Sequence, residues 1–138
     1  MVINKNCDIT LYNRYVDKST GIDKYQRTVI EGCNWQGGIS VTVSADDKGI
    51  TFMNGVSIII DRLNNYMPPK KFAKLSDNEK PNYFTFNISD KIVKGKIDFE
   101  ITGIKPNALA DLVKNFDDVI DIKGIDTNLP SHFEIEGV

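Results

Sequence analysis

The chain of 138 residues is the size of one domain and is long enough to bury a core of its own. Hydrophobic residues make up 41% and charged residues 26%, which excludes a disordered chain or a coiled coil as the main state. The net charge of −2 argues against a dedicated nucleic-acid binder, because such proteins carry a strongly basic surface. No apolar run reaches the ~20 residues of a membrane helix. The first residues, MVINKNCDITLYN, lack the pattern of a signal peptide, so we expect a protein made in the cytoplasm with no membrane segment.

Short alternating runs in the first part of the chain predict strands. Gly32 is expected to form a β-bulge, and Gly37-Gly38 is a turn signal. Asn54-Gly55 lies between two apolar runs and predicts a two-residue hairpin, because a type I′ turn needs positive φ at both positions. The predicted strands, in chain order, are 8–14, 25–34, 39–43, 50–53 and 56–61, with Ile39, Val41 and Val43 on one face of the third.

The stretch 62–83 interrupts this pattern with three prolines and many polar residues. It predicts a long loop, and long loops in compact domains are often functional.

Strand patterns resume after this loop, with one helix among them. Phe84, Phe86 and Ile88 are predicted to share one face of a strand. Residues 107–116 predict the single helix, with Asn107 as a cap and an apolar stripe at Leu109, Leu112, Val113 and Phe116. The predicted strands here are 84–88, 97–101, 118–126 and 132–136, with a short apolar run at 92–94. Roughly nine short strands with one polar face predict a mostly β fold, a small antiparallel β-barrel or sandwich with one α-helix at about 107–116. The whole of 1–138 is expected to form a single domain.

A search for catalytic and metal-binding patterns selects no site. His132 is the only histidine, so any triad would need it, and a lone histidine in a strand is more typical of packing or surface. Cys7 and Cys33 lack metal-ligand spacing; free thiols are expected, although the spacing also allows a disulfide. No calcium-loop spacing and no phosphate-binding glycine motif is present. We therefore expect no catalytic residue, no metal and no cofactor.

Two sets of residues are candidates for contact with partners. The mildly basic segment within 62–83 could touch the phosphates of nearby DNA, although a solvated loop would have the same composition. Aromatic residues early in the chain and two aspartates after the helix could form a subunit interface, although aromatics also fill barrel cores. The candidate partner loop comprises Pro68, Pro69, Lys70, Lys71, Phe72 and Lys74, and the candidate subunit interface comprises Tyr12, Tyr25, Trp35, Asp117 and Asp118.

The order of several short motifs resembles that of a family of small proteins encoded in phages and prophages of low-GC Gram-positive bacteria. The first matching motif is DITLYN at 8–13, followed by a polar loop, Tyr25, RTVI at 27–30, Gly32 and Trp35. Further along come Pro68-Pro69, then DKIVKG at 90–95, then HFEIEG at 132–137, which has Phe where Trp is common in the family. The resemblance covers nearly the whole chain, although no single motif is diagnostic.

This pattern also resembles the head-closure, or stopper, proteins of tailed phages. That resemblance implies a small β-barrel in the neck of the virion, without catalysis, which connects the head to the tail and helps to close the DNA channel. It implies a homo-oligomeric ring of six or twelve subunits that contacts portal or adaptor and tail-terminator proteins, with possible non-specific contact to packaged DNA. It also implies an extended loop that reaches the channel axis; the loop 62–83, with Pro68 to Lys74, is the candidate channel loop by its length, and 14–25 is the competitor. The alternatives are a tail terminator or minor capsid protein and, from another class, a small hydrolase or binding module.

Overall fold

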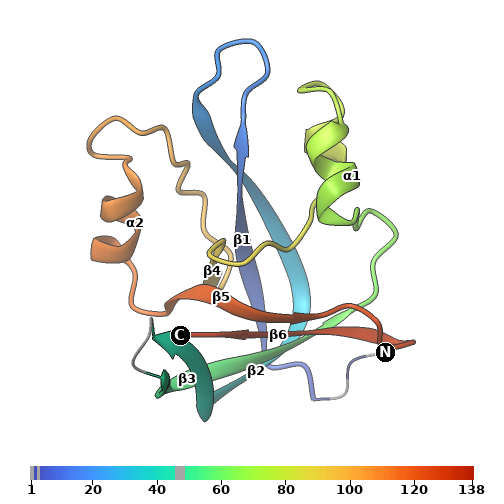
Figure 1. Cartoon of the computed structure of the whole chain (residues 1–138), viewed down its shortest axis with the longest axis vertical. Coiled ribbons are helices and arrows are strands. Elements are labelled where there is room, and N and C mark those ends of the chain that lie inside the picture. The colour runs from blue at the N-terminus through green and yellow to red at the C-terminus, as the bar shows by residue number, and fades with distance from the viewer. Residues whose placement is uncertain (1, 3, 46–48) are drawn as a thin grey trace.

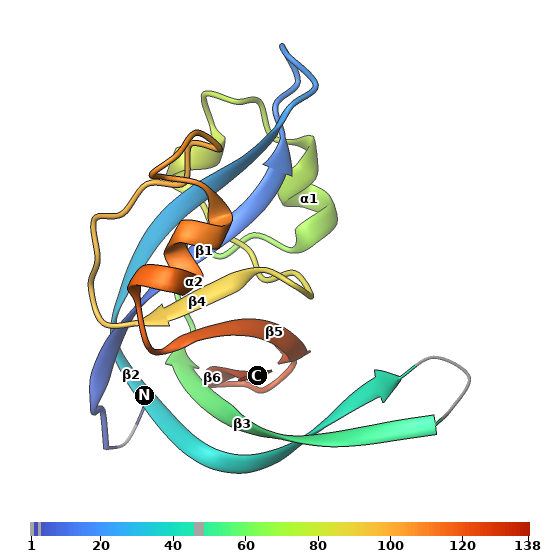
Figure 2. The same ribbon diagram turned by 90° about the vertical axis from the view of Figure 1, so that its left-hand side faces the viewer.

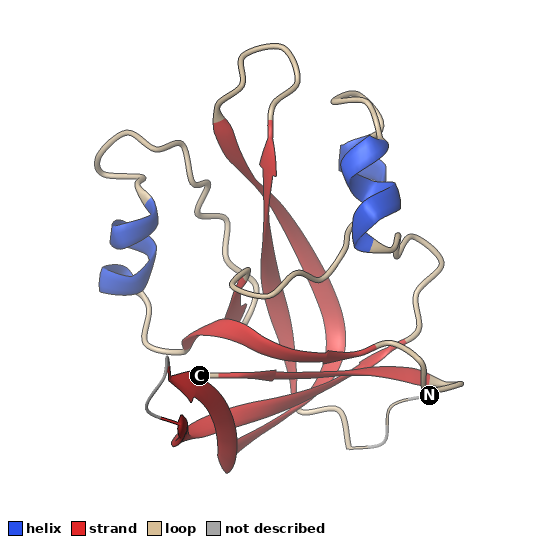
Figure 3. Cartoon of the chain, viewed as in Figure 1, coloured by secondary structure: helices blue, strands red, loops and turns tan. Residues whose placement is uncertain are grey.

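The computed structural model describes Val2, residues 4–45 and residues 49–138, with the backbone alone at 40–45 and 49–53. Six antiparallel strands close into a barrel in the order β1-β2-β3-β6-β5-β4 (Figures 1 and 3). The strands are β1 Cys7–Val16, β2 Asp23–Ala45, β3 Gly49–Asp61, β4 Lys91–Lys94, β5 Val119–Asp126 and β6 His132–Gly137. The helices are α1 Pro69–Lys74, the 3-10 turn η1 Lys80–Asn82, and α2 Leu109–Asn115. The predicted mostly β antiparallel barrel is confirmed.

The barrel interior is filled by aliphatic and aromatic side chains from alternate strand positions. Ile9 and Leu11 of β1 are fully buried, as the alternation predicts. Phe84, Phe86 and Phe133 pack edge to face, with ring centroids 5.5 Å apart for the first two and 5.6 Å for the last two. These contacts fix the segment around Phe84 inside the barrel mouth.

A second hydrophobic cluster lies outside the barrel wall. Tyr12, Val93, Ile101 and Leu112 are its buried members. The segment from 97 to 116, including α2, covers the outer face of β1 and β4 there. Tyr12 is fully buried, and its hydroxyl donates a 2.6 Å hydrogen bond to the Phe99 carbonyl. The predicted helix is confirmed with shorter bounds, Leu109–Asn115.

The predicted stripe of α2 needs one correction. Val113 is 55% exposed, whereas Leu112 is buried and Leu109 and Phe116 are half-buried. A helix that lies against a curved wall for two turns contacts it along a narrow line, so the stripe's edge stays in solvent. The predicted cap was also wrong, because the N-cap is Ala108 and Asn107 precedes it.

The hairpin predicted at Asn54-Gly55 is wrong, and so is the turn at Gly37-Gly38. β2 runs through Gly37-Gly38 with a register shift between Gln36 and Ile39. Asn54 and Gly55 are extended and pair with Ser40 and Ile39 of β2. Ala45 at the end of β2 pairs with Gly49 at the start of β3, and residues 46–48 lie outside the described part of the chain. The side chains of Val41 and Val43, which were predicted to share a face, also lie outside the part of the chain that the structure describes.

Two predicted strands are extended segments without a partner strand. Within 84–88, only Phe84 makes an isolated bridge, to Tyr66. The Thr85 N–H instead binds the Asn13 side chain, at 3.2 Å. Ile88 is 57% exposed, so the predicted shared face holds only for Phe84 and Phe86.

The segment 97–101 is held by side chains of β1 and β2 in the same way. The Ile97 N–H donates to Thr10 Oγ1, and the Ile97 carbonyl accepts from Arg27 Nη1. Because these partners are side chains, the segment keeps the alternation of a strand without joining the sheet.

The predicted loop 62–83 contains α1 and η1 and is docked on the β1–β2 hairpin. Lys18 Nζ donates to the Lys74 carbonyl at 3.1 Å, and Gln26 Nε2 donates to the Tyr83 carbonyl at 2.6 Å. Figure 1 shows α1 on one side of this hairpin and α2 on the other. No helix in the described part of the chain is long and apolar enough to span a membrane.

Candidate assembly surfaces

The predicted partner loop forms the helix α1, and most of its residues face solvent. Pro68 is the N-cap and Pro69 the first helical residue, a position where the absent N–H costs nothing. Lys70, Lys71 and Lys74 are exposed. These three lysines make a small basic face, and the loop is anchored rather than free.

Phe72 corrects the expectation for this loop, because its side chain is buried beneath α1 and offers no surface to a partner. It packs near Lys80, whose Nζ lies 5.9 Å from the Phe72 ring centroid and 5.4 Å from that of Tyr15. Lys80 is itself 1% exposed, and its Nζ donates to the Leu75 carbonyl at 2.6 Å. Burial lowers the pKa of this ammonium. Phe72 and Lys80 therefore fix α1 onto the hairpin.

The predicted subunit interface is only partly available on the surface. Tyr12 and Trp35 are buried within the subunit, so the expectation that they form an interface is corrected. Tyr25 is half-buried, whereas Asp117 and Asp118 are exposed just before β5. The aromatic pattern that suggested an interface belongs to the two hydrophobic clusters.

A groove lies along the end of β1 where it leaves the barrel. Pairing of β1 with β4 ends at Tyr12 opposite Lys91. Beyond that point, a pair of adjoining hollows runs between the strand, α1 and the turn at 87–90. We call this surface the β1-edge groove; its lining residues are Arg14, Tyr15, Val16, Pro69, Phe72, Ala73, Lys80, Asn87, Ile88 and Asp90.

The hydrogen bonds of β1 show which backbone groups face this groove. The Asp8 carbonyl accepts from Gly95 N, on the β4 side, whereas Asp17 N donates to Ile22 O, on the β2 side. Because backbone groups alternate sides along a strand, even-numbered residues face β4. The Arg14 carbonyl and the N–H and C=O of Val16 therefore point into the groove. Val16 is 54% exposed, and no other strand in the described part of the chain pairs with β1 here.

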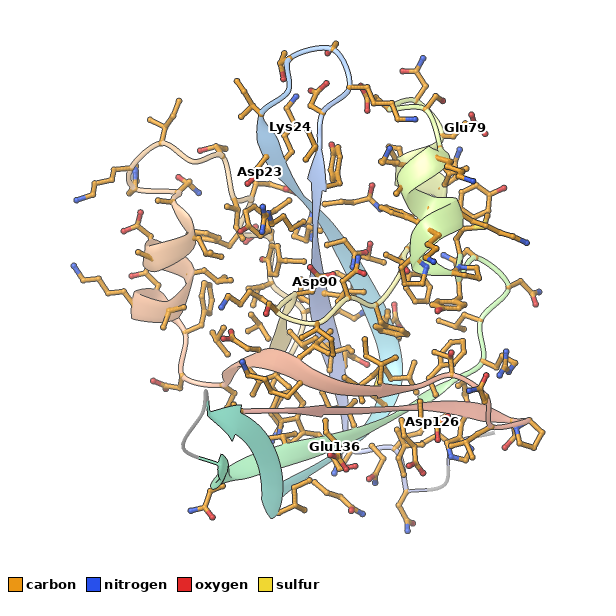
Figure 4. The ribbon with its side chains drawn as sticks, viewed as in Figure 1. Asp23, Lys24, Glu79, Asp90, Asp126 and Glu136 are labelled. Carbon is orange, nitrogen blue, oxygen red and sulfur yellow. The ribbon has the colours of Figure 1, made fainter. Side chains whose placement is uncertain are left out.

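Asp90 lines the groove and is part of a buried polar cluster; Figure 4 labels it near the centre of the molecule, beside β1. Its carboxylate accepts from Asn13 Nδ2 at 2.8 Å and from the Arg14 N–H at 3.2 Å. Asn13 Nδ2 also donates to the Thr85 carbonyl at 2.7 Å. Burial outweighs these hydrogen bonds and raises the pKa of Asp90 to about 6. The cluster holds β1 against the turn at 87–90 and substitutes for a missing β4 pair.

A further hollow of about 380 Å³ lies on the opposite face of the hairpin, against α2. Tyr15, Tyr25, Ile101 and Leu109 provide its apolar lining, with Asp23 and Lys24 at the strand end. Figure 4 shows Asp23 and Lys24 near the tip of the hairpin. Tyr15 lines both this hollow and the β1-edge groove.

A second open β surface is the part of the β2–β3 pair that leaves the barrel. β6 pairs with β3 only from Val56 to Asp61, and β1 pairs with β2 only up to Cys33. Residues 39–45 and 49–55 continue as a two-stranded ribbon, which Figure 2 shows projecting away from the barrel. Neither outer edge of this ribbon pairs with another described strand.

The remaining chemical groups do not converge on one site. His132 Nε2 lies 3.2 Å from Glu134 and its Nδ1 lies 3.0 Å from Ser131 Oγ, on the exterior of β6. Cys7 and Cys33 are free thiols at paired positions of β1 and β2, and burial raises the pKa of Cys33 to about 12. No group of three potential metal ligands occurs among the described residues.

Sequence reasoning missed the β1-edge groove because it depends on where β4 ends. The Asn13-Arg14 step, a polar pair inside a strand pattern, is the one signal that could have indicated it. The ribbon was missed because its glycines were interpreted as turns.

Comparison with known proteins places the chain in a family. No curated protein and no solved structure matches it. A family model matches residues 3–138, nearly the whole chain. The chain therefore belongs to the family of unknown function DUF6751.

Proposed function

We propose that this protein is a structural component of the neck of a tailed phage or prophage virion. It forms a homo-oligomeric ring that connects the portal or adaptor to the tail and helps to close the DNA channel. The ordered motifs over nearly the whole sequence support this proposal, as does the small barrel that carries them. The protein acts by assembly and performs no catalysis.

The observation that carries an assembly role is the ribbon formed by 39–45 and 49–55. A two-stranded hairpin is marginally stable alone in water, and unpaired strand edges invite pairing with other chains. A protein that keeps such an element outside its barrel gains stability by pairing it with a partner.

The exposed lysines of α1 support a position near DNA. Lys70, Lys71 and Lys74 carry three positive charges on one short helix, with no acidic residue in its first turn. Lysine ammonium groups bind phosphates without sequence preference, and such binding weakens as salt rises. In this proposal, the lysines line the channel and contact packaged DNA.

The test is electron microscopy of particles assembled without this protein, with the wild-type gene supplied in trans as the control. We expect DNA-filled heads that leak and carry no tails, together with free tails. Virions of normal form would overturn the proposal. Filled heads with tails of abnormal length would identify a tail terminator, and malformed heads a minor capsid protein; either result would replace the neck role.

A further inference from the structure

The same molecule carries two open β surfaces at different places. One is the β1-edge groove, where three backbone groups of Arg14 and Val16 face outward. The other is the projecting ribbon, whose outer edges lack a strand. Two different surfaces on one chain are what a head-to-tail interface requires, and such an interface gives a ring where the rotation from copy to copy closes.

The β1-edge groove has the shape and chemistry that a strand needs. The Arg14 carbonyl and the Val16 N–H and carbonyl offer one acceptor, one donor and a second acceptor in line, the pattern that an added strand satisfies. Pro69 and Ala73 supply an apolar wall from α1, and Phe72, whose side chain is buried, supports that wall from within. Asn87 and Ile88 bound the groove on the side of the 87–90 turn.

Two exposed apolar side chains, Val16 and Ile88, line this groove, and a third, Ile22, lies in the turn of the β1–β2 hairpin beside Asp17. Val16 is 54%, Ile22 62% and Ile88 57% exposed, and these are three of the five large hydrophobic side chains with high exposure among the described residues. All three belong to the β1–β2 hairpin end or to the groove's rim. Clustered exposed apolar side chains mark a contact surface more than scattered ones do.

The ribbon fits as the occupant by length and by form. Each of its strands has seven residues beyond the bulge, 39–45 and 49–55, and therefore extends about 24 Å at ~3.4 Å per residue. The edge from Arg14 to Val16 needs only a part of that length. The ribbon is already extended, so docking it costs less conformational entropy than ordering a free peptide.

We propose that the ribbon of one copy docks in the β1-edge groove of the next copy and pairs with β1 as an added strand. This interface rests on the ring of the proposed function and gives it a specific contact. The same contact repeated from copy to copy uses both surfaces on every subunit.

The first test measures self-association of the purified chain by sedimentation velocity. We expect concentration-dependent association of the wild type, weakened about tenfold or more by Val16→Pro, because the proline removes the outward N–H without touching the β1–β2 ladder. Val16→Ala, which keeps that N–H, is expected to weaken association less. Thermal unfolding of each variant separates loss of the interface from loss of the fold. A wild-type chain that stays monomeric up to ~1 mM, or equal association in Val16→Pro and the wild type, would overturn the proposal.

The second test uses matched exposed isoleucines and a cross-linker. Ile88→Ser is expected to weaken association, whereas Ile104→Ser, at a side chain 74% exposed in the loop before α2, is expected to leave it unchanged. A photo-reactive residue at position 88 should label 39–45 or 49–55 of another copy. Adducts confined to other segments would contradict the proposed pairing.

The two proposals fail separately. If the protein associates through this groove but virions form normally without it, the neck role is overturned and the interface stands. If particles without the protein leak and lack tails, but Val16→Pro associates as strongly as the wild type, the neck role stands and the interface is overturned.

Discussion

Asp90 predicts an unusual dependence of stability on pH. Its carboxyl is 3% exposed, and burial raises its pKa to about 6 in the folded protein. In the unfolded chain an aspartate titrates near ~3.9. The folded protein therefore binds the proton of Asp90 more tightly than the unfolded chain does. The stabilisation that this proton gives is complete at a pH below ~3.9 and is lost as the pH rises through about 6.

The size of this effect follows from the two pKa values. A difference of about two pKa units corresponds to ~3 kcal/mol of unfolding free energy over the whole titration. About half of it, ~1.4 kcal/mol, falls between pH 5 and pH 8. The pKa of Asp17 is held below its ordinary value by Lys24 and Ser19, so its own contribution changes below that window.

The assay is urea unfolding of the wild type and two variants at intervals from pH 5 to pH 8. We expect the unfolding free energy of the wild type to fall by about 1–2 kcal/mol over this range. Asp90→Asn, which does not titrate, should lose that slope, although its amide places a donor against Asn13 or Arg14 and lowers stability at every pH. Asp118→Asn, at an exposed site, should keep the wild-type slope. A wild-type protein that gains stability from pH 5 to pH 8, or an unchanged slope in Asp90→Asn, would refute the reasoning.

Three further predictions concern the packing of the barrel. Phe86→Ala should lower the unfolding free energy by about 3–5 kcal/mol, because Phe86 is fully buried. Ile88→Ala should lower it by less than ~0.5 kcal/mol, because Ile88 is 57% exposed. Equal losses for the two variants in urea unfolding would contradict this. Gly137→Ala should lower the unfolding free energy by about 1–3 kcal/mol, because the added Cβ would lie 2.6 Å from the Asp121 carbonyl oxygen. Gly37→Ala places its Cβ in open space, so it should lower the melting temperature far less than Gly137→Ala does. Cys33 should resist iodoacetamide at pH 8 in the native protein and react in urea; rapid native alkylation, measured by mass spectrometry, would show that its thiol is accessible.

The sequence predicted the barrel well where strands pair with strands. Residues 8–14, 118–126 and 132–136 became β1, β5 and β6 with small changes at their ends, because in each an alternating pattern coincides with a partner on a neighbouring strand. Gly32 does form the predicted bulge, with φ at +72° and a register shift opposite Cys7 to Ile9. A residue that tolerates positive φ was needed there, and the sequence provides it.

Predictions failed where the deciding interaction is distant in the sequence. The alternation at 84–88 and 97–101 correctly indicated faces that contact apolar clusters, but side chains such as Asn13 and Arg27 supply the hydrogen bonds that a partner strand would have made. Asn54-Gly55 had the composition of a turn, yet its pairing with Ile39 and Ser40 holds it extended. Local propensity is overridden in both cases by tertiary contacts.

The candidate surfaces were only partly predictable for a related reason. Lys70, Lys71 and Lys74 are exposed as a basic segment suggests, and Asp117 and Asp118 are exposed after the helix. Tyr12 and Trp35 look the same in a sequence whether they face a core or a partner. Only the folded barrel shows whether such a side chain is buried in the core or exposed to a partner.

The continuity of β2 has a mechanical consequence. One strand, Asp23–Ala45, passes from the β1–β2 hairpin through the barrel wall into the ribbon, and β3 accompanies it from Gly49 to Asp61. A pull along the ribbon acts parallel to these strands, so the ladder hydrogen bonds, which are perpendicular to the strands, resist it in shear and must break together. Tension on the ribbon is thereby shared with β6 and β1 inside the barrel, instead of opening a hinge at its base. A protein built in this way can carry a load on the ribbon without first unfolding its own domain.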